Sequence, residues 1–383
     1  MVLTSTDLEL TIDGRHLLFP AVWLRDNCPC SECVAPGTSQ KLRDITEMPN
    51  GLGITQTQHA PDSVAVTFAP DQHRSVFSRA WLAGHALDHH DDSGGRTEDG
   101  KQLWVPAGLD AVPETSWPRY LAKDRAAALA AVLRLGFVLV HDVPAEPGMV
   151  LEVAASFGFV RETNYGRLFD VRVEPAPGNL AFTSRAIALH TDNPYRDPVP
   201  TLQLLHCLRT AAKEKGDGET GGDTGLVDGF AAAAAFRAAD PEGFGVIART
   251  PAPFGYSDGS AELRACQPLI QLSPRGRVAG VRFNNRSARA LQAPHAEVTA
   301  FYAAYRRWAA LLAEPERQLN LRLAPGDCLI FDNTRILHAR TAFSMSAGSP
   351  GRHLQGCYAD LDSLASTLAR LSRAGRREES EEP

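Results

Sequence analysis

Short apolar segments, broken by Gly, Pro and Asp, recur along most of the sequence and restrict the folds open to it. Alternating apolar residues bounded by turn residues are typical of β-strands. The clearest segments lie at 8–12, 17–19, 64–68, 137–140, 327–331 and 354–358. Three segments instead show helix patterns, at 124–135, 230–239 and 300–314. Many short strands with few helices favour a mainly β, jelly-roll or cupin-like barrel with helices packed outside it.

The length and the composition along the chain predict two domains. A chain of 383 residues is too long for one average domain. The segment 89–101 is rich in His, Asp, Gly and Glu and has the pattern of a solvated linker. We expect a small β domain with its linker over 1–110, a larger β domain over 111–375, and a charged, disordered tail over 376–383.

The charge and hydropathy patterns argue against several classes of partner. The formal net charge of −6 comes from 45 acidic and 39 basic residues. The sequence shows no basic stripe with interleaved aromatic residues, the pattern that would indicate a nucleic-acid partner. No long apolar run of a signal peptide precedes Gly14. The most apolar stretch, 126–140, contains Arg134 and is too short to span a bilayer. We therefore expect a cytoplasmic protein without a membrane or nucleic-acid partner.

Two histidines and one carboxylate have the pattern of an iron site. His190 and Asp192 are two residues apart, so in a strand both side chains point to the same face. His338 follows an apolar strand and a turn far downstream. Two imidazoles and one carboxylate on one face form the facial triad of non-haem iron(II) oxygenases, which leaves positions open for a bidentate 2-oxo acid and for O₂.

A 2-oxo acid co-substrate also needs a cation for its distal carboxylate. Arg352 lies fourteen residues after His338 (352 − 338), on the next segment with a strand pattern. Its planar guanidinium can bind a carboxylate through two hydrogen bonds. The sequence therefore predicts an oxygenase that consumes a 2-oxo acid such as 2-oxoglutarate.

Three cysteines crowd into six residues of the small domain. In a reducing cytoplasm Cys28, Cys30 and Cys33 are more typical of a metal site than of disulfides. A closed structural zinc site needs a fourth ligand, and by spacing His85 is one candidate. An iron–sulfur cluster would normally need a fourth thiolate, which this domain does not offer.

Motifs along nearly the whole chain, in the same order, resemble the γ-butyrobetaine dioxygenase family. The wider group includes trimethyllysine and taurine dioxygenases. The resemblance implies a double-stranded β-helix core, iron(II), 2-oxoglutarate, a zinc-binding N-terminal domain and a homodimer. The motifs are WLRDNCPCSEC at 23–33, NYG at 164–166, HTD at 190–192, QLLHC at 203–207, VDGF at 227–230, FNN at 283–285 and RHLQGCYAD at 352–360.

The resemblance also implies roles for single residues. It makes His73 the fourth zinc ligand, and it places Leu205 with Arg352 at the 2-oxoglutarate site. Family members bind a quaternary ammonium group among aromatic faces. The matching residues here are Tyr165, Phe169, Phe182 and Tyr358. Asn285 matches a family residue that contacts the substrate carboxylate, and Asn179 matches another position in the pocket. These four aromatic residues would form a cage around the ammonium group. Phe169 and Phe182 stand where relatives carry Trp and Tyr, so the cation–π contacts of this cage are expected to be weaker.

The expected reaction is hydroxylation of γ-butyrobetaine to carnitine, with ascorbate as a helpful additive in vitro. This sequence differs from its relatives at residues expected near the anionic end of the substrate, which leaves a different substrate open. Ala288 stands where relatives have a basic residue, Asn193 replaces an aromatic or aliphatic one, and Arg286 and Arg289 follow Asn285. An inward-pointing arginine would favour a phosphonate, such as 2-(trimethylamino)ethylphosphonate or 2-aminoethylphosphonate.

A second class of function is a non-catalytic, metal-binding protein with a cupin-like fold. Such a protein is expected to have lost the metal-binding carboxylate or the 2-oxoglutarate arginine. This chain retains both Asp192 and Arg352, which favours the enzyme.

Overall fold

The chain divides into two compact units, Met1–Asp92 and Ser93–Pro383. The computed structural model describes residues 5–86, 100–173, 183–210, 221–343 and 351–381, with side chains described up to residue 374. The division lies 18 residues before the predicted boundary at 110 (110 − 92). Residues just after the linker already pack on the larger unit, because the backbone N–H of Trp104 donates to Asp228 and its indole Nε1 donates to the carbonyl of Leu135.

The smaller unit is a β module with two short helices. A hairpin and a three-stranded antiparallel sheet enclose an apolar core that includes Leu10, Phe19 and Phe68. In the first strand every second residue is buried, as the alternating sequence predicts. Its elements are β1 (Asp7–Ile12), β2 (Arg15–Pro20), α1 (Ala21–Asp26), the 3₁₀ turn η1 (Ile45–Glu47), β3 (Gly53–His59), β4 (Ser63–Ala69), β5 (Arg74–Ser78) and α2 (Arg79–Gly84).

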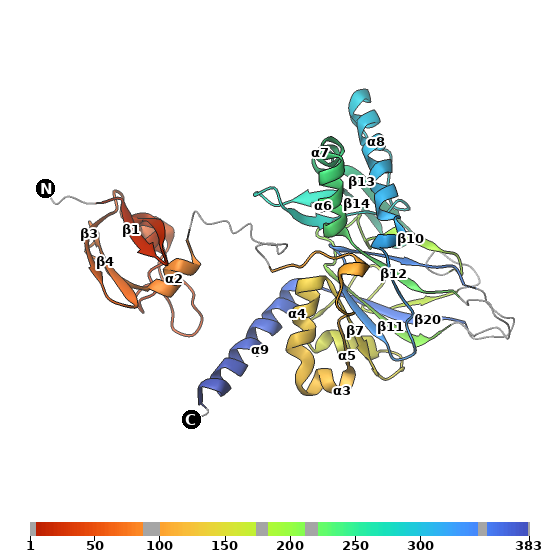
Figure 1. The fold of residues 1–383 in the computed structure, drawn as a ribbon, viewed down its shortest axis with the longest axis horizontal. Coiled ribbons are helices and arrows are strands. Elements are labelled where there is room, and N and C mark those ends of the chain that lie inside the picture. Colours follow the sequence, from red (N-terminus) through yellow and green to blue (C-terminus); the bar gives the residue numbers. More distant parts are fainter. Residues whose placement is uncertain (1–4, 87–99, 174–182, 211–220, 344–350, 382–383) are drawn as a thin grey trace. The chain divides into compact units, whose positions relative to one another are not determined.

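Two β-sheets form the centre of the larger unit (Figure 1). The larger sheet has the order β6 (Glu114–Ser116), β7 (Phe137–His141), β18 (Cys328–Asp332), β11 (Leu202–Arg209), β20 (His353–Ala359) and β8 (Val160–Arg161), and β9 (Phe169–Arg172) also pairs with β20. The smaller sheet has the order β10 (Ile187–His190), β19 (Ile336–Arg340), β12 (Thr224–Asp228) and β17 (Leu319–Leu321). This arrangement confirms the predicted mainly β, cupin-like fold with flanking helices.

Helices cover the outer face of the larger sheet. The described apolar residues of α4 (Arg125–Leu135), α5 (Met149–Ala155) and α9 (Leu361–Glu381) share one core with alternate residues of β7, β11, β18 and β20. The opposite residues of β11, which include Gln203 and Leu205, face the space between the sheets. The short elements before α4 are η2 (Pro106–Gly108), α3 (Trp117–Arg119) and the π-helical turn η3 (Tyr120–Asp124).

A second helical group carries two hairpins beside the smaller sheet. Its core joins helix residues such as Phe236 and Trp308 to Phe254 and Ile270 of the hairpins. The elements are α6 (Gly229–Ala239), α7 (Pro241–Arg249), β13 (Ala252–Ser257), β14 (Glu262–Gln267), β15 (Ile270–Leu272), β16 (Val278–Val281), α8 (His295–Leu312) and the 3₁₀ turn η5 (Pro315–Arg317).

Helix ends follow the sequence signals in one place and depart from them in two. Helix α4 ends at Gly136, whose φ of +89° is the left-handed conformation that glycine adopts at helix ends. Helix α7 was not predicted, because Asp240 and Pro241 follow α6 directly and resemble a stop signal, although together they start the next helix. Helix α9 runs to Glu381, where the sequence predicts a disordered tail from 376. Glu, Arg and Ala are good helix formers, which extend an existing helix.

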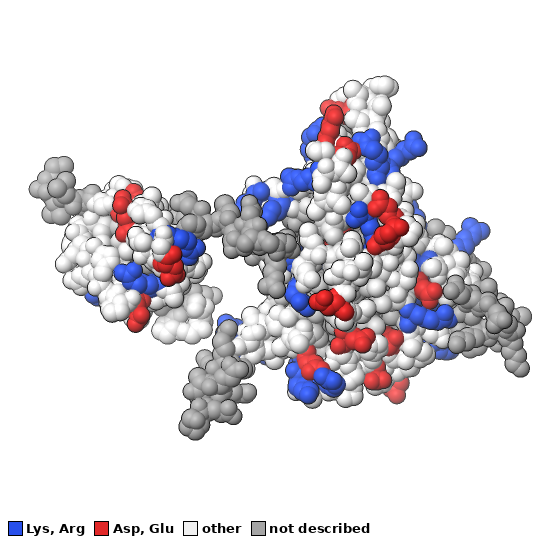
Figure 2. Space-filling view, in the orientation of Figure 1, with Lys and Arg blue, Asp and Glu red and all other residues white. Residues whose placement is uncertain are grey.

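Surface and hydropathy features add two observations. Among the described residues no helix is both long enough and apolar enough to cross a bilayer. On the face of the larger unit seen in Figure 2, basic and acidic side chains are interspersed.

Candidate active site

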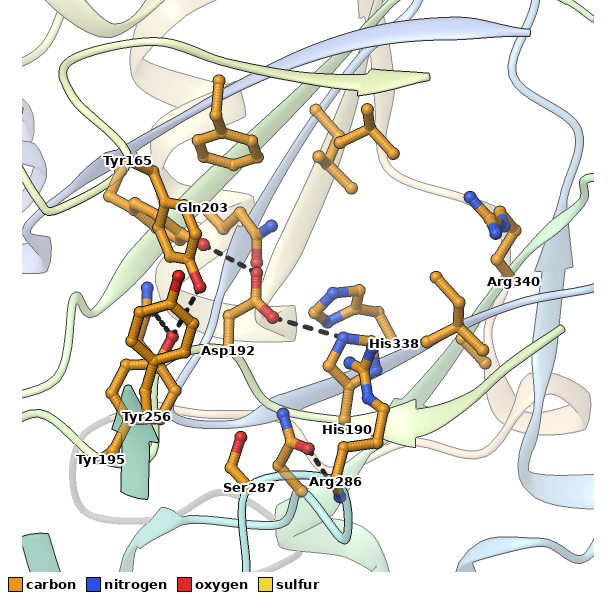
Figure 3. Close-up of a pocket in the computed structure, with 18 of the residues that line it drawn as sticks. Tyr165, His190, Asp192, Tyr195, Gln203, Tyr256, Arg286, Ser287, His338 and Arg340 are labelled. Atoms are coloured by element: carbon orange, nitrogen blue, oxygen red, sulfur yellow. Dashed lines mark hydrogen bonds and ion pairs between the residues drawn. The ribbon is translucent and has the colours of Figure 1, made fainter. Parts of the chain in front are cut away.

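The predicted iron ligands come together at one end of two neighbouring strands. Strands β10 and β19 pair antiparallel, and His190 lies directly opposite His338 in their register. Their ring centroids are 4.1 Å apart. Asp192 follows two residues after His190, and the three side chains bring their ligand atoms within 4.8 Å of one another (Figure 3). The fold therefore gathers two imidazoles and one carboxylate on one side of the smaller sheet.

The protonation of this cluster suits a metal ion. The carbonyl of Ala188 can only accept a hydrogen bond, so His190 Nδ1, 2.9 Å away, carries the proton and leaves Nε2 for a metal. Burial, with the nearby His190, lowers the pKa of His338 to about 3, so its imidazole is neutral. Burial raises the pKa of Asp192, but its contacts with His190, His338 and Tyr358 together lower it by more, so the carboxyl is ionised. Metal ligands need these deprotonated forms.

A side chain from another strand end fixes the backbone of the His-x-Asp segment. The amide N–H of Asp192 donates to Asn333 Oδ1 at 2.7 Å, and Asn333 Nδ2 donates back to the carbonyl of Asp192 at 3.0 Å. Asn333 follows β18 and is 1% exposed. This double hydrogen bond fixes the position of Asp192 relative to the larger sheet.

A cavity of about 430 Å³ opens from the triad into the space between the two sheets. This volume suits a small-molecule site. The predicted cofactor residues both line the cavity: Leu205 lies on β11, and Arg352 lies just before β20. Arg352 lies against Gly222, which has a φ of +82° and where an added Cβ would approach Arg352 Cδ to 3.3 Å. Burial lowers the pKa of Arg352.

A second buried arginine in this cavity was not predicted. Arg340 lies two residues after His338 on β19, and its Nη2 donates to the carbonyls of Thr183 and Arg185. Burial, with repulsion from Arg352 and Arg286, lowers the pKa of Arg340 to about 10, so it stays charged at neutral pH. The cavity wall therefore carries at least two buried positive charges.

Aromatic side chains form one wall of the cavity beside Asp192. Phe169 lies between two predicted cage residues, with ring centroids 5.0 Å from Tyr358 and 6.3 Å from Tyr165. Two tyrosines that sequence reasoning missed extend this wall. A hydrogen bond of 2.9 Å joins the hydroxyl groups of Tyr195 and Tyr165. Tyr256 stacks on Tyr195, with ring centroids 5.1 Å apart (Figure 3). Phe182 and Asn179, the other predicted substrate residues, lie outside the described residues.

The loop after β16 presents its side chains to two different cavities. Arg286 and Arg289 both line the main cavity, and Arg286 is near enough for its charge to lower the pKa of His338 further. Asn285, predicted to bind the substrate, instead lines a second cavity and accepts a hydrogen bond from Tyr305. Its neighbour Asn284 lines the main cavity. Consecutive residues of a tight loop point to opposite sides, which a motif match cannot resolve.

The smaller unit contains the predicted cysteine cluster, completed by His73. His73 Nε2 lies 3.1, 3.7 and 3.6 Å from the sulfurs of Cys28, Cys30 and Cys33. A tetrahedron with metal–ligand bonds of about 2.0–2.3 Å has edges of roughly 3.5 Å, so the four atoms fit a zinc ion. The ring of the other candidate, His85, instead stacks on Trp81, and its Nδ1 forms a hydrogen bond with the backbone carbonyl of Trp81.

Sequence comparisons place both units in known families. The profile of the taurine catabolism dioxygenase TauD, TfdA family matches residues 97–358, and the N-terminal profile of γ-butyrobetaine hydroxylase-like proteins matches residues 3–83.

Curated relatives match along almost the whole chain. A γ-butyrobetaine dioxygenase of Pseudomonas sp. (strain AK-1) is 35% identical over 94% of this chain and 92% of its own length. The human γ-butyrobetaine dioxygenase is 30% identical over 93% of this chain and 95% of its own. A trimethyllysine dioxygenase of Meyerozyma guilliermondii is 28% identical over 94% and 92%. The chain therefore belongs to the γ-butyrobetaine dioxygenase family, within the TauD/TfdA dioxygenases.

Proposed function

We propose that this dioxygenase hydroxylates γ-butyrobetaine to carnitine, with iron(II) on His190, Asp192 and His338 and with 2-oxoglutarate on Arg352 and Leu205. One observation carries the proposal. A single cavity joins the three ligand side chains, a buried arginine and an aromatic wall. These parts match the iron, the co-substrate carboxylate and the trimethylammonium group respectively.

The residues of the cavity divide the work of the reaction. Bound iron supplies the activation of O₂ that is coupled to oxidative decarboxylation of 2-oxoglutarate to succinate and CO₂. Arg352 would hold the distal carboxylate of 2-oxoglutarate through charge-assisted hydrogen bonds. Tyr165, Phe169 and Tyr358 would hold the trimethylammonium group by cation–π contacts of about 0.5–2 kcal/mol each. Held by its trimethylammonium group, the substrate would present one C–H bond to the metal and limit the access of water.

A phosphonate substrate such as 2-(trimethylamino)ethylphosphonate or 2-aminoethylphosphonate is the second candidate, and the positions of Arg286 and Arg289 favour it. Both line the cavity, whereas Asn285, the residue expected at a substrate carboxylate, does not. A phosphonate carries more negative charge than a carboxylate and offers three acceptor oxygens. It would therefore gain more from two guanidinium groups.

A substrate comparison separates the two candidates. Wild-type protein and the variants Arg286→Gln and Arg289→Gln are assayed by mass spectrometry with γ-butyrobetaine, 2-(trimethylamino)ethylphosphonate and 2-aminoethylphosphonate. The exposed Arg306→Gln on α8 is the matched control. Preferred turnover of γ-butyrobetaine by the wild type supports the first proposal. Preferred turnover of a phosphonate, lost about ten- to a hundred-fold in either variant, supports the second, since charge-assisted hydrogen bonds contribute about 1.5–3 kcal/mol.

The proposal includes three further features of the protein. A structural zinc ion on Cys28, Cys30, Cys33 and His73 is supported by the geometry of those four side chains. A homodimer is supported by the family resemblance, and a cytoplasmic location by the unpaired cysteines.

A further inference from the structure

The hydroxyl of Tyr358 contacts the metal-binding carboxylate itself. Its OH donates to Asp192 Oδ2 at 2.8 Å, while the other carboxylate oxygen, Oδ1, lies 3.3 Å from His190 Nε2. Figure 3 shows the Asp192 carboxylate between the aromatic wall and the two imidazoles. One oxygen therefore faces the imidazoles and the other is occupied by a phenol.

Strand pairing and packing fix the position of this phenol. Tyr358 lies in β20 opposite Gln203 of β11 on one side and Arg161 of β8 on the other. Its side chain is buried, with 3% exposed, and its ring packs on Phe169. The donor is therefore held by the larger sheet, whereas Asp192 follows a strand of the smaller sheet.

A carboxylate can bind a metal through one oxygen or through both, and the choice matters here. Each additional oxygen on the metal removes a coordination position. A facial triad with one carboxylate oxygen leaves three positions, which a bidentate 2-oxo acid and O₂ together fill. A hydrogen bond to the second oxygen restrains the carboxylate to one-oxygen binding.

We infer that Tyr358 is a positioning residue that keeps Asp192 a one-oxygen metal ligand and so preserves the position needed by the co-substrate. The inference rests on the proposed iron site and adds a role for the phenol hydroxyl, distinct from the aromatic face that a substrate would contact. The restraint acts on the side chain alone, because Asn333 holds the Asp192 backbone independently.

The variant Tyr358→Phe separates the two roles, since it keeps the aromatic face and removes only the hydroxyl. Tyr165→Phe is the matched control: it removes another phenol hydroxyl from the same wall, one that contacts Tyr195 and not a ligand. The full-length, zinc-loaded protein is titrated with Mn(II), which prefers oxygen and imidazole ligands to thiolates and leaves the cysteine cluster alone. Electron paramagnetic resonance reports free and bound Mn(II), and 2-oxoglutarate is then titrated into the Mn(II)-loaded protein.

We expect Tyr358→Phe to bind Mn(II) about tenfold or more weakly, as is usual when a partner of a metal ligand is lost. The spectrum of its bound Mn(II) should differ from wild type, and 2-oxoglutarate affinity should fall. Tyr165→Phe should match the wild type in all three. Wild-type Mn(II) affinity and spectrum in Tyr358→Phe, or equal losses in both variants, would overturn the positioning role alone. If the wild type bound no Mn(II), or if His338→Ala bound Mn(II) as tightly as the wild type, the proposed iron site would be overturned as well.

Discussion

Arg352 and Arg340 are both buried in one cavity, yet only one was identified from the sequence. Arg340 donates to two backbone carbonyls, which gives it a structural task. Arg352 is the residue predicted to bind the distal carboxylate of 2-oxoglutarate.

Arg352→Gln should raise the KM for 2-oxoglutarate about ten- to a hundred-fold. The variant loses a charge-assisted, bidentate interaction of about 1.5–3 kcal/mol. Initial rates at varied 2-oxoglutarate measure the change, and the exposed Arg370→Gln is the control. An unchanged KM in Arg352→Gln would assign the anchor to another residue.

At the proposed zinc site, the buried Arg25 provides a test of thiolate stabilisation. Its Nη1 donates to Cys33 Sγ at 3.4 Å and its Nε donates to Asp71 at 2.9 Å. A site of three thiolates and one zinc ion carries a net negative charge, which the guanidinium offsets. Arg25→Met should therefore release zinc to a chelator at least tenfold faster than wild type. Arg74→Met, which removes an exposed arginine next to His73, should release zinc at the wild-type rate, and equal rates in all three proteins would count against this role.

At the scale of elements, one buried ion pair ties the start of the larger unit to its core. Arg335 binds Asp228 through Nε at 3.0 Å and Nη2 at 2.8 Å, with neither side chain exposed. Its remaining donors bind the carbonyls of Arg134 and Gln102. Asp228 ends β12 and also caps α6 by accepting from the N–H of Phe230.

Arg335→Met should lower the free energy of unfolding by about 3–5 kcal/mol, because it leaves the Asp228 carboxylate buried without its countercharge. The double variant Arg335→Met/Asp228→Leu should recover part of this loss, since it removes the buried charge too. Urea denaturation followed by circular dichroism measures both. A loss below 1 kcal/mol in the single variant would show that the pair contributes little.

A second element-scale test concerns pH. His141, at the end of β7, contacts Asp327 at 2.7 Å and Glu114 at 3.2 Å. Burial lowers the pKa of His141, but these two carboxylates raise it more, so the folded pKa lies above the unfolded value. The charged histidine therefore stabilises the fold fully below the unfolded pKa, about 6.5, and this stabilisation is lost as pH rises through the folded pKa.

The variant His141→Gln keeps a hydrogen-bonding side chain but cannot titrate. Melting temperatures of wild type and variant should differ most near pH 6 and converge above the folded pKa. A gap that stays constant between pH 6 and pH 9 would contradict the coupling.

At the scale of the molecule, the sequence predicts what local chemistry determines and misses what loops and packing decide. Period-two alternation and the cap at Gly136 were sufficient for β1 and α4, because neighbouring residues set those patterns. The spacing of His190 and Asp192 places both side chains together by strand geometry. By contrast, Tyr256 reaches the cavity from the β13–β14 hairpin, and no local signal reports which hairpin approaches which sheet.

Coupled turnover tests directly whether the protein is an iron(II)- and 2-oxoglutarate-dependent hydroxylase of a trimethylammonium substrate. Purified protein is supplied with iron(II), 2-oxoglutarate, O₂ and γ-butyrobetaine, and succinate and hydroxylated product are quantified together by mass spectrometry. We expect equal molar amounts of the two products from the wild type and neither from Asp192→Ala. No succinate above background with any trimethylammonium compound would rule out this hydroxylase activity, and undiminished turnover in Asp192→Ala would rule out the iron site.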